Sequence, residues 1–203
     1  MSTDLPPRLL EMICSRICHD LVSPVGAINN GIELIEDIGD EVTEEAHGLI
    51  ADSARQAAHR LAMFRLAFGA GSSGANMAAV RVILGDYFAG GRITLDWPET
   101  SAMHIPQQLL ALTVMTGADL VQNSATLRLT DDGPDGVVVA VTGAGSDYIS
   151  RIADALAGNT SEDKLDPRSA VAYLLGRLAV RKGIDLSFAA IASEQVEFHL
   201  RYA

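Results

Sequence analysis

A long amphipathic pattern at the start of the chain constrains its fold more than any other feature. Apolar residues follow a heptad-like 3-4 spacing at Leu10, Ile13, Cys14, Ile17, Leu21, Ile28, Ile32 and Ile35. We expect a helix from about Leu5 to Asp37, because Pro6 and Pro7 suit a first helical turn. A helix of this length reaches roughly 50 Å, so its apolar stripe needs partners along its whole length.

A second helical pattern follows the acidic loop Gly39–Glu45, in which Thr43 is a suitable N-cap, and is expected to end near Phe68. One side of this helix carries Leu49, Ile50, Ser53, Ala57, Leu61, Phe64 and Phe68. Two antiparallel helices with apolar stripes form only half of a bundle. We therefore predict a four-helix bundle that a second copy of the chain completes.

The pattern changes after the Gly/Ser-rich segment 69–75. Helices are expected at Met77–Ala89, Ile105–Val121, Ser146–Ala157 and Pro167–Lys182, the last with Asp166 as its N-cap. Alternating residues predict strands at Arg92–Trp97, Ala125–Thr130, Val137–Thr142, Asp185–Ile191 and Gln195–Tyr202. The predicted class is α+β, with a helical hairpin in residues 1–70 and an α/β sandwich in residues 76–203, whose sheet is mixed or antiparallel.

The charge and hydropathy of the chain narrow its partners. A formal net charge of −11 argues against nucleic acid or an anionic membrane as the main partner. The polar start of the chain predicts no secretory signal, and the apolar runs are too short to span a bilayer. The mean hydropathy of +0.20 is high, which apolar helix faces hidden in an oligomer would explain. We expect a cytoplasmic oligomer.

The two cysteines, Cys14 and Cys18, lie one helical turn apart near the apolar stripe. With His19 they offer three metal ligands, but no second Cys/His cluster stands nearby in the sequence. We therefore expect no metal and interpret both residues as reduced, packed thiols.

Within the first helix, His19, Asp20 and Pro24 form the pattern that carries chemistry. At about 100° per residue, His19 lies roughly 200° from the stripe residues on either side, so we expect it to be exposed. Imidazole has an unperturbed pKa of about 6.5 and is a nitrogen nucleophile near neutral pH, able to attack a phosphoryl group. Asp20 can fix the ring tautomer and take up the proton. Pro24 cannot donate to the carbonyl of Asp20, so the helix should bend there.

A predicted docking surface surrounds the imidazole, formed by Ser15, Arg16, Asp20, Ser23, Gly26, Ala27 and Asn30. Gly26 costs about 1 kcal/mol relative to alanine inside a helix, which favours close approach of a partner's backbone. Tight packing between helices is the alternative explanation for these small residues. A lone histidine on a helix is usually a solvated surface residue, but the adjacent carboxylate and the proline together favour function.

The motif His19-Asp20-Leu-Val-Ser-Pro24 resembles the H-box of histidine-kinase dimerisation domains. The longer string from His19 to Leu34, with the segment from Asp166 to Leu175, is similar to the ChpT family of alphaproteobacterial histidine phosphotransferases. The resemblance implies a homodimer with a degenerate kinase-like ATPase domain and His19 as the phosphoacceptor. It also implies relay from the receiver domain of a CckA-type hybrid kinase to CtrA- and CpdR-type response regulators. No cofactor is needed, because the receiver supplies Mg²⁺.

The second domain lacks the residues of a working kinase. The helix that should hold an ATP-binding asparagine has none before Asn123, and the segment Thr142–Gly145 has two glycines without the adenine-reading aspartate. No glycine-rich lid follows, so we predict no use of ATP. Arg168 lies in a first helical turn, where a cation opposes the helix dipole, and is predicted to reach towards a receiver. A solvated or locally paired arginine is the alternative.

These observations favour a cytoplasmic phosphotransferase that relays phosphate through a histidine without ATP. Two other functions stay open. One is a non-catalytic dimeric adaptor that binds receiver domains. The other is an autophosphorylating histidine kinase core, against which the missing nucleotide-binding residues argue.

Overall fold

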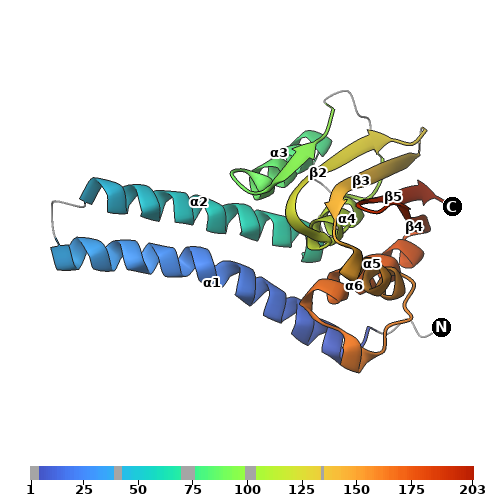
Figure 1. Ribbon diagram of the computed structural model, residues 1–203, viewed down its shortest axis with the longest axis horizontal. Helices are drawn as coiled ribbons and strands as arrows, with labels where there is room; N and C mark the ends of the chain where they lie inside the picture. Colours follow the sequence, from blue (N-terminus) through green and yellow to red (C-terminus); the bar gives the residue numbers. More distant parts are fainter. Residues whose placement is uncertain (1–4, 39–42, 70–75, 99–103, 134) are drawn as a thin grey trace.

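The computed structural model describes residues 5–38, 43–69, 76–98, 104–133 and 135–203. Two long helices form a hairpin that projects from an α/β body (Figure 1). Helix α1 spans Pro7–Ile38 and helix α2 spans Thr43–Phe68, which confirms both predicted helices. The predicted acidic loop and glycine-rich segment fall mostly on residues 39–42 and 70–75, which lie outside the described residues.

The body is a five-stranded mixed sheet packed against helices, with the strand order β1-β2-β3-β5-β4. Strand β1 runs parallel to β2, and the other neighbours are antiparallel. Its elements are α3 (Met77–Phe88), β1 (Ile93–Asp96), α4 (Gln107–Asp119), β2 (Val121–Asp131), β3 (Gly136–Ala144), α5 (Ser146–Leu156), η2 (Glu162–Lys164), α6 (Pro167–Arg181), β4 (Ile184–Ala192) and β5 (Gln195–Tyr202). The α+β class is confirmed, and of the two sheet types left open the mixed one is present.

The largest boundary error concerns the end of α4. The predicted helix continues to Val121, whereas α4 ends at Asp119 and β2 already begins at Val121, four residues before the predicted strand. Val121 pairs with Ala144 of β3, so pairing within the sheet outweighs the helical periodicity of the local sequence. The short 3-10 helix η2 was not predicted.

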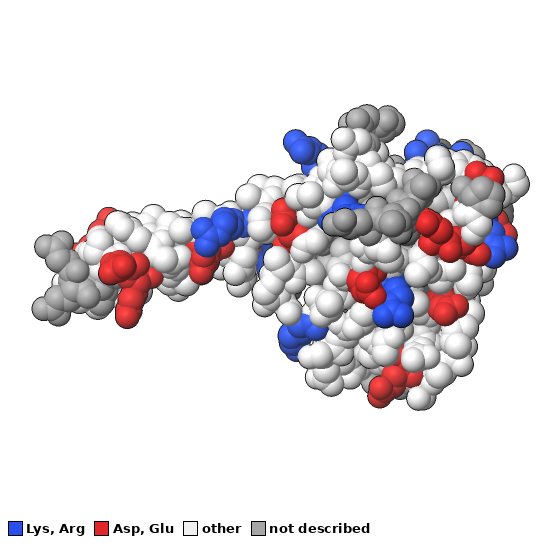
Figure 2. Space-filling model, turned by 90° about the horizontal axis from the view of Figure 1, so that it is seen from above, with Lys and Arg blue, Asp and Glu red and all other residues white. Residues whose placement is uncertain are grey.

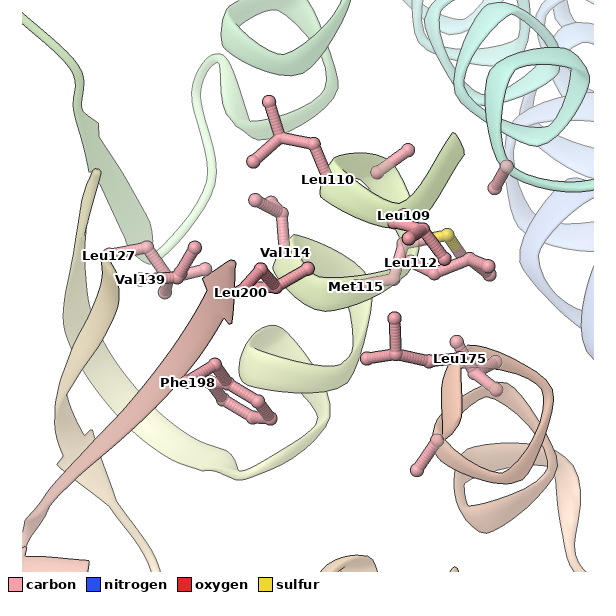
Figure 3. Packing of buried hydrophobic residues seen from close by; sticks show 14 of the residues in the cluster. Leu109, Leu110, Leu112, Val114, Met115, Leu127, Val139, Leu175, Phe198 and Leu200 are labelled. Carbon is pink, nitrogen blue, oxygen red and sulfur yellow. The ribbon is translucent and has the colours of Figure 1, made fainter. Parts of the chain in front are cut away.

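Helix α4 forms the centre of the core. Its residues from Leu109 to Gly117 are all buried, as expected for a helix that is apolar on every side. Figure 3 shows Val114 on the side of α4 that faces the sheet, and Leu175 of α6 across from the opposite side of α4. Residues placed at the end of α4 are therefore held by a rigid element.

The same hydrophobic cluster continues from the body into the hairpin. Leu9 and Ile13 of α1 and Met63 and Phe64 of α2 belong to it, and these helices pack on α6 and α4. Further out the two helices approach closely, since a Cβ added at Gly31 would lie 2.6 Å from Ile50 Cγ1. The division of the chain at residues 70–76 stays a prediction.

A stripe of α1 is left uncovered by the residues that the structure describes. It consists of exposed residues inside a sector of about 80°, namely Leu10, Cys14, Cys18, Val25 and Ile32, which we call the open stripe. The prediction of packed thiols is wrong for the single chain, because α2 covers the adjacent side of α1, where Leu9, Ile13, Pro24 and Gly31 are buried. In the part of the chain that the structure describes, no helix has the length and apolar character needed to cross a bilayer.

Candidate functional site

His19 lies on the exposed side of α1, with 86% of its side chain exposed to solvent. This confirms the predicted exposure. Its Nδ1 is 3.1 Å from Oδ1 of Asp20, the carboxylate next in the sequence. When the neutral ring carries its hydrogen on Nδ1, Asp20 accepts that hydrogen bond and the lone pair of Nε2 is left as the nucleophilic position.

Asp20 does not lie on the outer face, contrary to the prediction. Only 17% of its side chain is exposed, and its second oxygen, Oδ2, accepts a hydrogen bond from Arg16 Nε at 2.8 Å. The reason is helical geometry, because adjacent residues point about 100° apart, so Asp20 faces inward while His19 faces solvent. Both carboxylate oxygens of Asp20 are thus engaged.

Arg16, predicted to belong to the docking surface, lies beside His19 but is mostly buried, and its guanidinium is engaged within the chain. Its side chain is only 12% exposed and forms an ion pair with Asp119 at the end of α4. Arg16 Nη1 donates to Asp119 Oδ1 at 2.8 Å and to Oδ2 at 2.9 Å. One guanidinium therefore joins two carboxylates, Asp20 from its own helix and Asp119 from the body.

Burial and charge act in opposite directions on this cluster. Burial opposes the charge of Arg16, but the charges of Asp119 and Asp20 outweigh it and raise the pKa of Arg16. Burial raises the pKa of Asp119 to about 6, against the opposing effect of Arg16. Burial likewise raises the pKa of the neighbouring Tyr87, which stays neutral. The guanidinium of Arg16 thus lies between the carboxyl groups of Asp119 and Asp20.

Pro24 affects the same site through the backbone. Helix α1 continues through Pro24, but this residue has no N–H to donate to the carbonyl of Asp20, four residues earlier. Arg60 of α2 donates to that carbonyl oxygen through Nη1 instead. In Figure 1 the N-terminal part of α1 runs at an angle to its C-terminal part, as expected for a proline-induced bend. The freed carbonyl therefore fixes α1 to α2 beside the imidazole.

A cleft of about 370 Å³ brings the predicted residues of two distant segments together. It is lined by Ser15, Arg16, His19, Asp20, Asp119, Tyr148, Asp166, Pro167 and Arg168. Arg168 Cζ lies 5.0 Å from the centroid of the Tyr148 ring, a cation–π distance. The structure thus places the exposed Arg168 in the same cleft as His19.

The start of α6 fixes the position of Arg168. Oδ1 of Asp166 accepts hydrogen bonds from the backbone N–H groups of Arg168 at 3.0 Å and Ser169 at 2.7 Å. In return, the Ser169 hydroxyl accepts a hydrogen bond from the backbone N–H of Asp166 at 3.0 Å, which completes a capping box. Arg151 Nη2 lies 2.8 Å from the other Asp166 oxygen. The predicted N-cap is confirmed.

The remaining predicted docking residues lie on α1 with different exposures. Ser15, Ser23 and Asn30 are exposed, whereas Gly26 and Ala27 are half-buried. Among the described residues, no atom outside the adjoining helix backbone lies within 4 Å of a Cβ added at Gly26, so the packing that the structure describes does not require a glycine there. Among the described residues, no three His, Cys, Asp or Glu side chains are grouped so that they could hold a metal ion.

Two glycines at the end of β3, Gly143 inside the strand and Gly145 just after it, have structural explanations. Gly143 has φ of +95°, and a Cβ there would lie 2.7 Å from the Ser124 carbonyl oxygen. A Cβ at Gly145 would lie 2.7 Å from Gln122 Nε2. Both positions are therefore filled by contacts with β2.

Sequence reasoning missed Asp119, Arg60 and Tyr148 as parts of the site. Asp119 had one usable signal, since it ends a helix that is otherwise apolar on all sides, and a buried carboxylate requires a partner. The freed carbonyl of Asp20 likewise called for a donor, but nothing in the local sequence points to Arg60. The partner of each lies in another segment of the chain.

Comparisons with known proteins agree with this geometry. Residues 77–194 match the family model for the histidine phosphotransferase C-terminal domain. The chain is 33% identical over 198 residues to the protein phosphotransferase ChpT of Brucella abortus (strain 2308), with 91% of each chain covered. A solved structure described as a bacterial phosphotransferase superposes with a TM-score of 0.76 at 29% identity and covers 98% of both chains.

The fold and the site define a histidine phosphotransferase of the two-component signalling class, and the chain belongs to this family. Within the family it is a ChpT-type protein, which confirms the resemblance inferred from the His19 motif.

Proposed function

We propose that this chain relays phosphoryl groups between receiver domains through His19. Nε2 of His19 attacks the phosphorus of an aspartyl phosphate on the receiver domain of a CckA-type hybrid kinase. A nitrogen–phosphorus bond forms, the phosphorus–oxygen bond to the aspartate breaks, and the aspartate leaves as a carboxylate with the electron pair. In the second step a carboxylate oxygen of the aspartate of a CtrA- or CpdR-type regulator attacks the phosphorus of the phosphohistidine. An oxygen–phosphorus bond forms, the nitrogen–phosphorus bond breaks, and Nε2 regains its electron pair, which leaves neutral imidazole with its hydrogen on Nδ1.

The observation that carries the proposal is the pairing of an exposed imidazole with a fixed carboxylate. When Nε2 gains the phosphoryl group, the ring becomes positively charged with its hydrogen on Nδ1. Asp20 Oδ1, 3.1 Å from Nδ1, accepts a hydrogen bond from the Nδ1–H group and stabilises the positive charge of the phosphorylated ring. The partly buried position of Asp20 strengthens this effect, because its charge is less screened by water than that of an exposed carboxylate.

A receiver domain would dock over the small side chains near the ring. Ser15 and Ser23 lie one turn before and one turn after His19 and leave room for close approach. Arg168 offers a cation on the far side of the cleft, where it stacks on Tyr148 and can pair with a carboxylate or phosphoryl oxygen. The receiver brings its own Mg²⁺ and aspartate, so the chain supplies only a positioned nucleophile and a docking surface.

The proposal excludes ATP as the phosphoryl donor. No asparagine lies on α4, and its terminal carboxylate, Asp119, is used in the ion pair with Arg16. The glycine pair Gly143 and Gly145 packs against β2. In this proposal the body resembles a kinase domain in fold, but its residues at these positions form contacts within the chain and bind no nucleotide.

The proposal also includes a homodimer in which the open stripe packs against a second copy. Leu10 in this stripe is 69% exposed in the single chain, and a row of such residues along a long helix favours a helical partner. Figure 2 shows large uncharged areas along the projecting hairpin, between scattered acidic and basic side chains. A cytoplasmic location stays a prediction from the sequence.

One transfer experiment tests the relay. A receiver domain carrying ³²P-aspartyl phosphate is mixed with the wild-type chain, with His19→Ala and with His59→Ala, a histidine on α2 that serves as the matched control. We expect label on wild type and His59→Ala and none on His19→Ala. In the same assay Arg168→Ala should raise the receiver concentration needed for half-maximal transfer without changing the melting temperature.

The other outcomes separate the alternatives. Receiver binding without label on any variant would identify an adaptor. Label taken directly from [γ-³²P]ATP, with no receiver present, would identify a kinase. Label retained on His19→Ala would place the phosphoacceptor elsewhere.

A further inference from the structure

We infer that Asp119 is a positioning residue for His19, acting through Arg16 and Asp20. The inference rests on the proposed function, in which His19 is the phosphoacceptor. It assigns to the body of the molecule a part in the chemistry of the hairpin, carried by one carboxylate at the end of α4.

The contacts form a continuous path from the core to the imidazole. Both oxygens of Asp119 accept from Arg16 Nη1, at 2.8 and 2.9 Å. Arg16 Nε donates to Asp20 Oδ2 at 2.8 Å, and Asp20 Oδ1 lies 3.1 Å from His19 Nδ1. Exposure rises along the path, from 7% for Asp119 to 86% for the imidazole. A buried anchor is thus linked to a solvent-exposed reactive group.

The charges explain why two carboxylates share one guanidinium. Arg16 carries one positive charge, whereas Asp20 and Asp119 together carry two negative charges, so the cluster has a net charge of −1. If Asp119 were neutral, Arg16 would attract Asp20 alone and draw its carboxylate away from the imidazole. Asp119 therefore leaves Asp20 with negative charge available to the Nδ1 hydrogen of His19.

Rigid surroundings make this path suitable for positioning. Asp119 ends a helix whose side chains fill the core, and Arg60 holds the backbone of Asp20 by its carbonyl oxygen. Asp20 is consequently held at both its side chain and its backbone. A fixed acceptor at Nδ1 selects the tautomer that leaves Nε2 free to attack, which a mobile carboxylate would not do.

Asp119→Asn tests the inference, because it removes the charge and keeps the size and one acceptor oxygen. The matched control is Asp96→Asn, which neutralises an exposed carboxylate paired with Arg128 at 2.7 Å in the same body. For each variant we would measure the rate of phosphoryl transfer from a labelled receiver. The tautomer of His19 would be read from its ¹⁵N chemical shifts in the unphosphorylated protein at pH 8.

We expect Asp119→Asn to slow transfer roughly tenfold, the usual size of an effect passed on by an outer-shell partner. The ¹⁵N shifts should show less hydrogen on Nδ1 and more on Nε2. Asp96→Asn should change neither. An unchanged tautomer in folded Asp119→Asn would overturn the inference, even if transfer slowed.

A double-mutant cycle separates positioning from a general structural role. If Asp119 acts through Asp20, Asp20→Asn combined with Asp119→Asn should be no slower than Asp20→Asn alone. If the rate loss of the double variant equalled the product of the two single losses, Asp119 would act by a route that does not pass through Asp20. If Asp119→Asn does not fold, Arg16→Met with Asp119→Asn leaves no unpaired buried charge from the pair and removes the guanidinium that draws Asp20 away. Hydrogen should then stay on Nδ1 of His19, and a shift of hydrogen to Nε2 in this double variant would overturn the inference.

The tautomer measurement keeps this inference distinct from the proposed function. It uses no receiver and no phosphate, so it reports on the path even if His19 is never phosphorylated. Failure of wild type to accept label would refute the relay, whereas a wild-type tautomer in Asp119→Asn would refute only the positioning by Asp119.

Discussion

The inner and outer faces of the hairpin differ sharply, although the same two helices carry both. On α1, Leu9 is 2% exposed and packs into the core, whereas its neighbour Leu10 is 69% exposed. The inner face is completed within one chain by α2, α4 and α6. The outer face has equally apolar residues, and no other described part of the chain covers them.

This difference between the two faces shows which contacts of α1 one chain completes by itself. His19, Asp20 and Arg16 lie where α1 meets the body, and their contacts are complete within the chain. The open stripe lies on another side of the same helix, and its burial requires a second molecule. In the proposed relay, phosphoryl transfer and dimer formation therefore use different faces of α1.

The largest expected effect comes from truncating the inner face. Leu9→Ala should lower the free energy of unfolding by about 2–5 kcal/mol, because it leaves a cavity in the shared core. Leu10→Ala, one residue further along, should change it by no more than about 0.5 kcal/mol when the protein is monomeric. Urea unfolding at low protein concentration measures both. Equal losses of unfolding free energy in Leu9→Ala and Leu10→Ala would contradict the distinction between the two faces.

A charge on the open stripe should act on assembly. Val25→Glu is expected to weaken the dimer at least tenfold, equivalent to about 1.4 kcal/mol, because the carboxylate would be desolvated against a second helix. Sedimentation velocity across a concentration series measures the dissociation constant. Asn30→Glu, on the His19 side of α1, is the control and should leave it unchanged. A dimer that tolerates Val25→Glu would place the interface elsewhere.

The smallest expected effect concerns the N-cap of α6, which positions Arg168 in the cleft that it shares with His19. Asp166→Ala should cost about 1 kcal/mol at pH 7 through loss of the N-cap. Although partial burial opposes it, the hydrogen bonds from Ser169 lower the pKa of Asp166 below its ordinary value of 3.8. A depressed pKa in the folded state stabilises the protein above the ordinary value, and this stability is lost as the pH falls through the folded pKa.

The difference in stability between wild type and Asp166→Ala should therefore be constant near neutral pH and shrink below about pH 4. Thermal unfolding from pH 2.5 to 7 measures it, with Asp154→Ala, an exposed carboxylate on α5, as the control. A difference that stays constant down to pH 2.5 would show that the cap does not depend on the charge.

Features set by neighbouring residues were predictable from the sequence. The exposure of His19 and its contact with Asp20 follow from helical geometry, and the cap at Asp166 follows from the Asp-Pro pair that opens α6. Periodicity also gave the helices and strands, except at the end of α4, where sheet pairing decides.

Features set by distant residues were not predictable. Arg16 looked like a surface cation, because nothing near it in sequence shows that Asp119 lies within 2.8 Å. Asp20 was placed on the outer face although it lies about 100° from His19 around the helix, and its contact with Arg60 of α2 could not be inferred from nearby residues. Periodicity shows which residues of α1 share an apolar face and cannot show what covers that face, so it could not tell that one chain leaves the open stripe exposed.

The ion pair between Arg16 and Asp119 has a consequence for synthesis of the chain. The two residues are 103 positions apart, so the ribosome has made the whole of the first hairpin well before α4 emerges. Until then Asp20 has no competitor for Arg16, and His19 is exposed on a helix whose carboxylate is held differently. His19, the proposed phosphoacceptor, is therefore present early in translation, but the contacts that link it through Asp20 and Arg16 to Asp119 form only after the body has folded around α4.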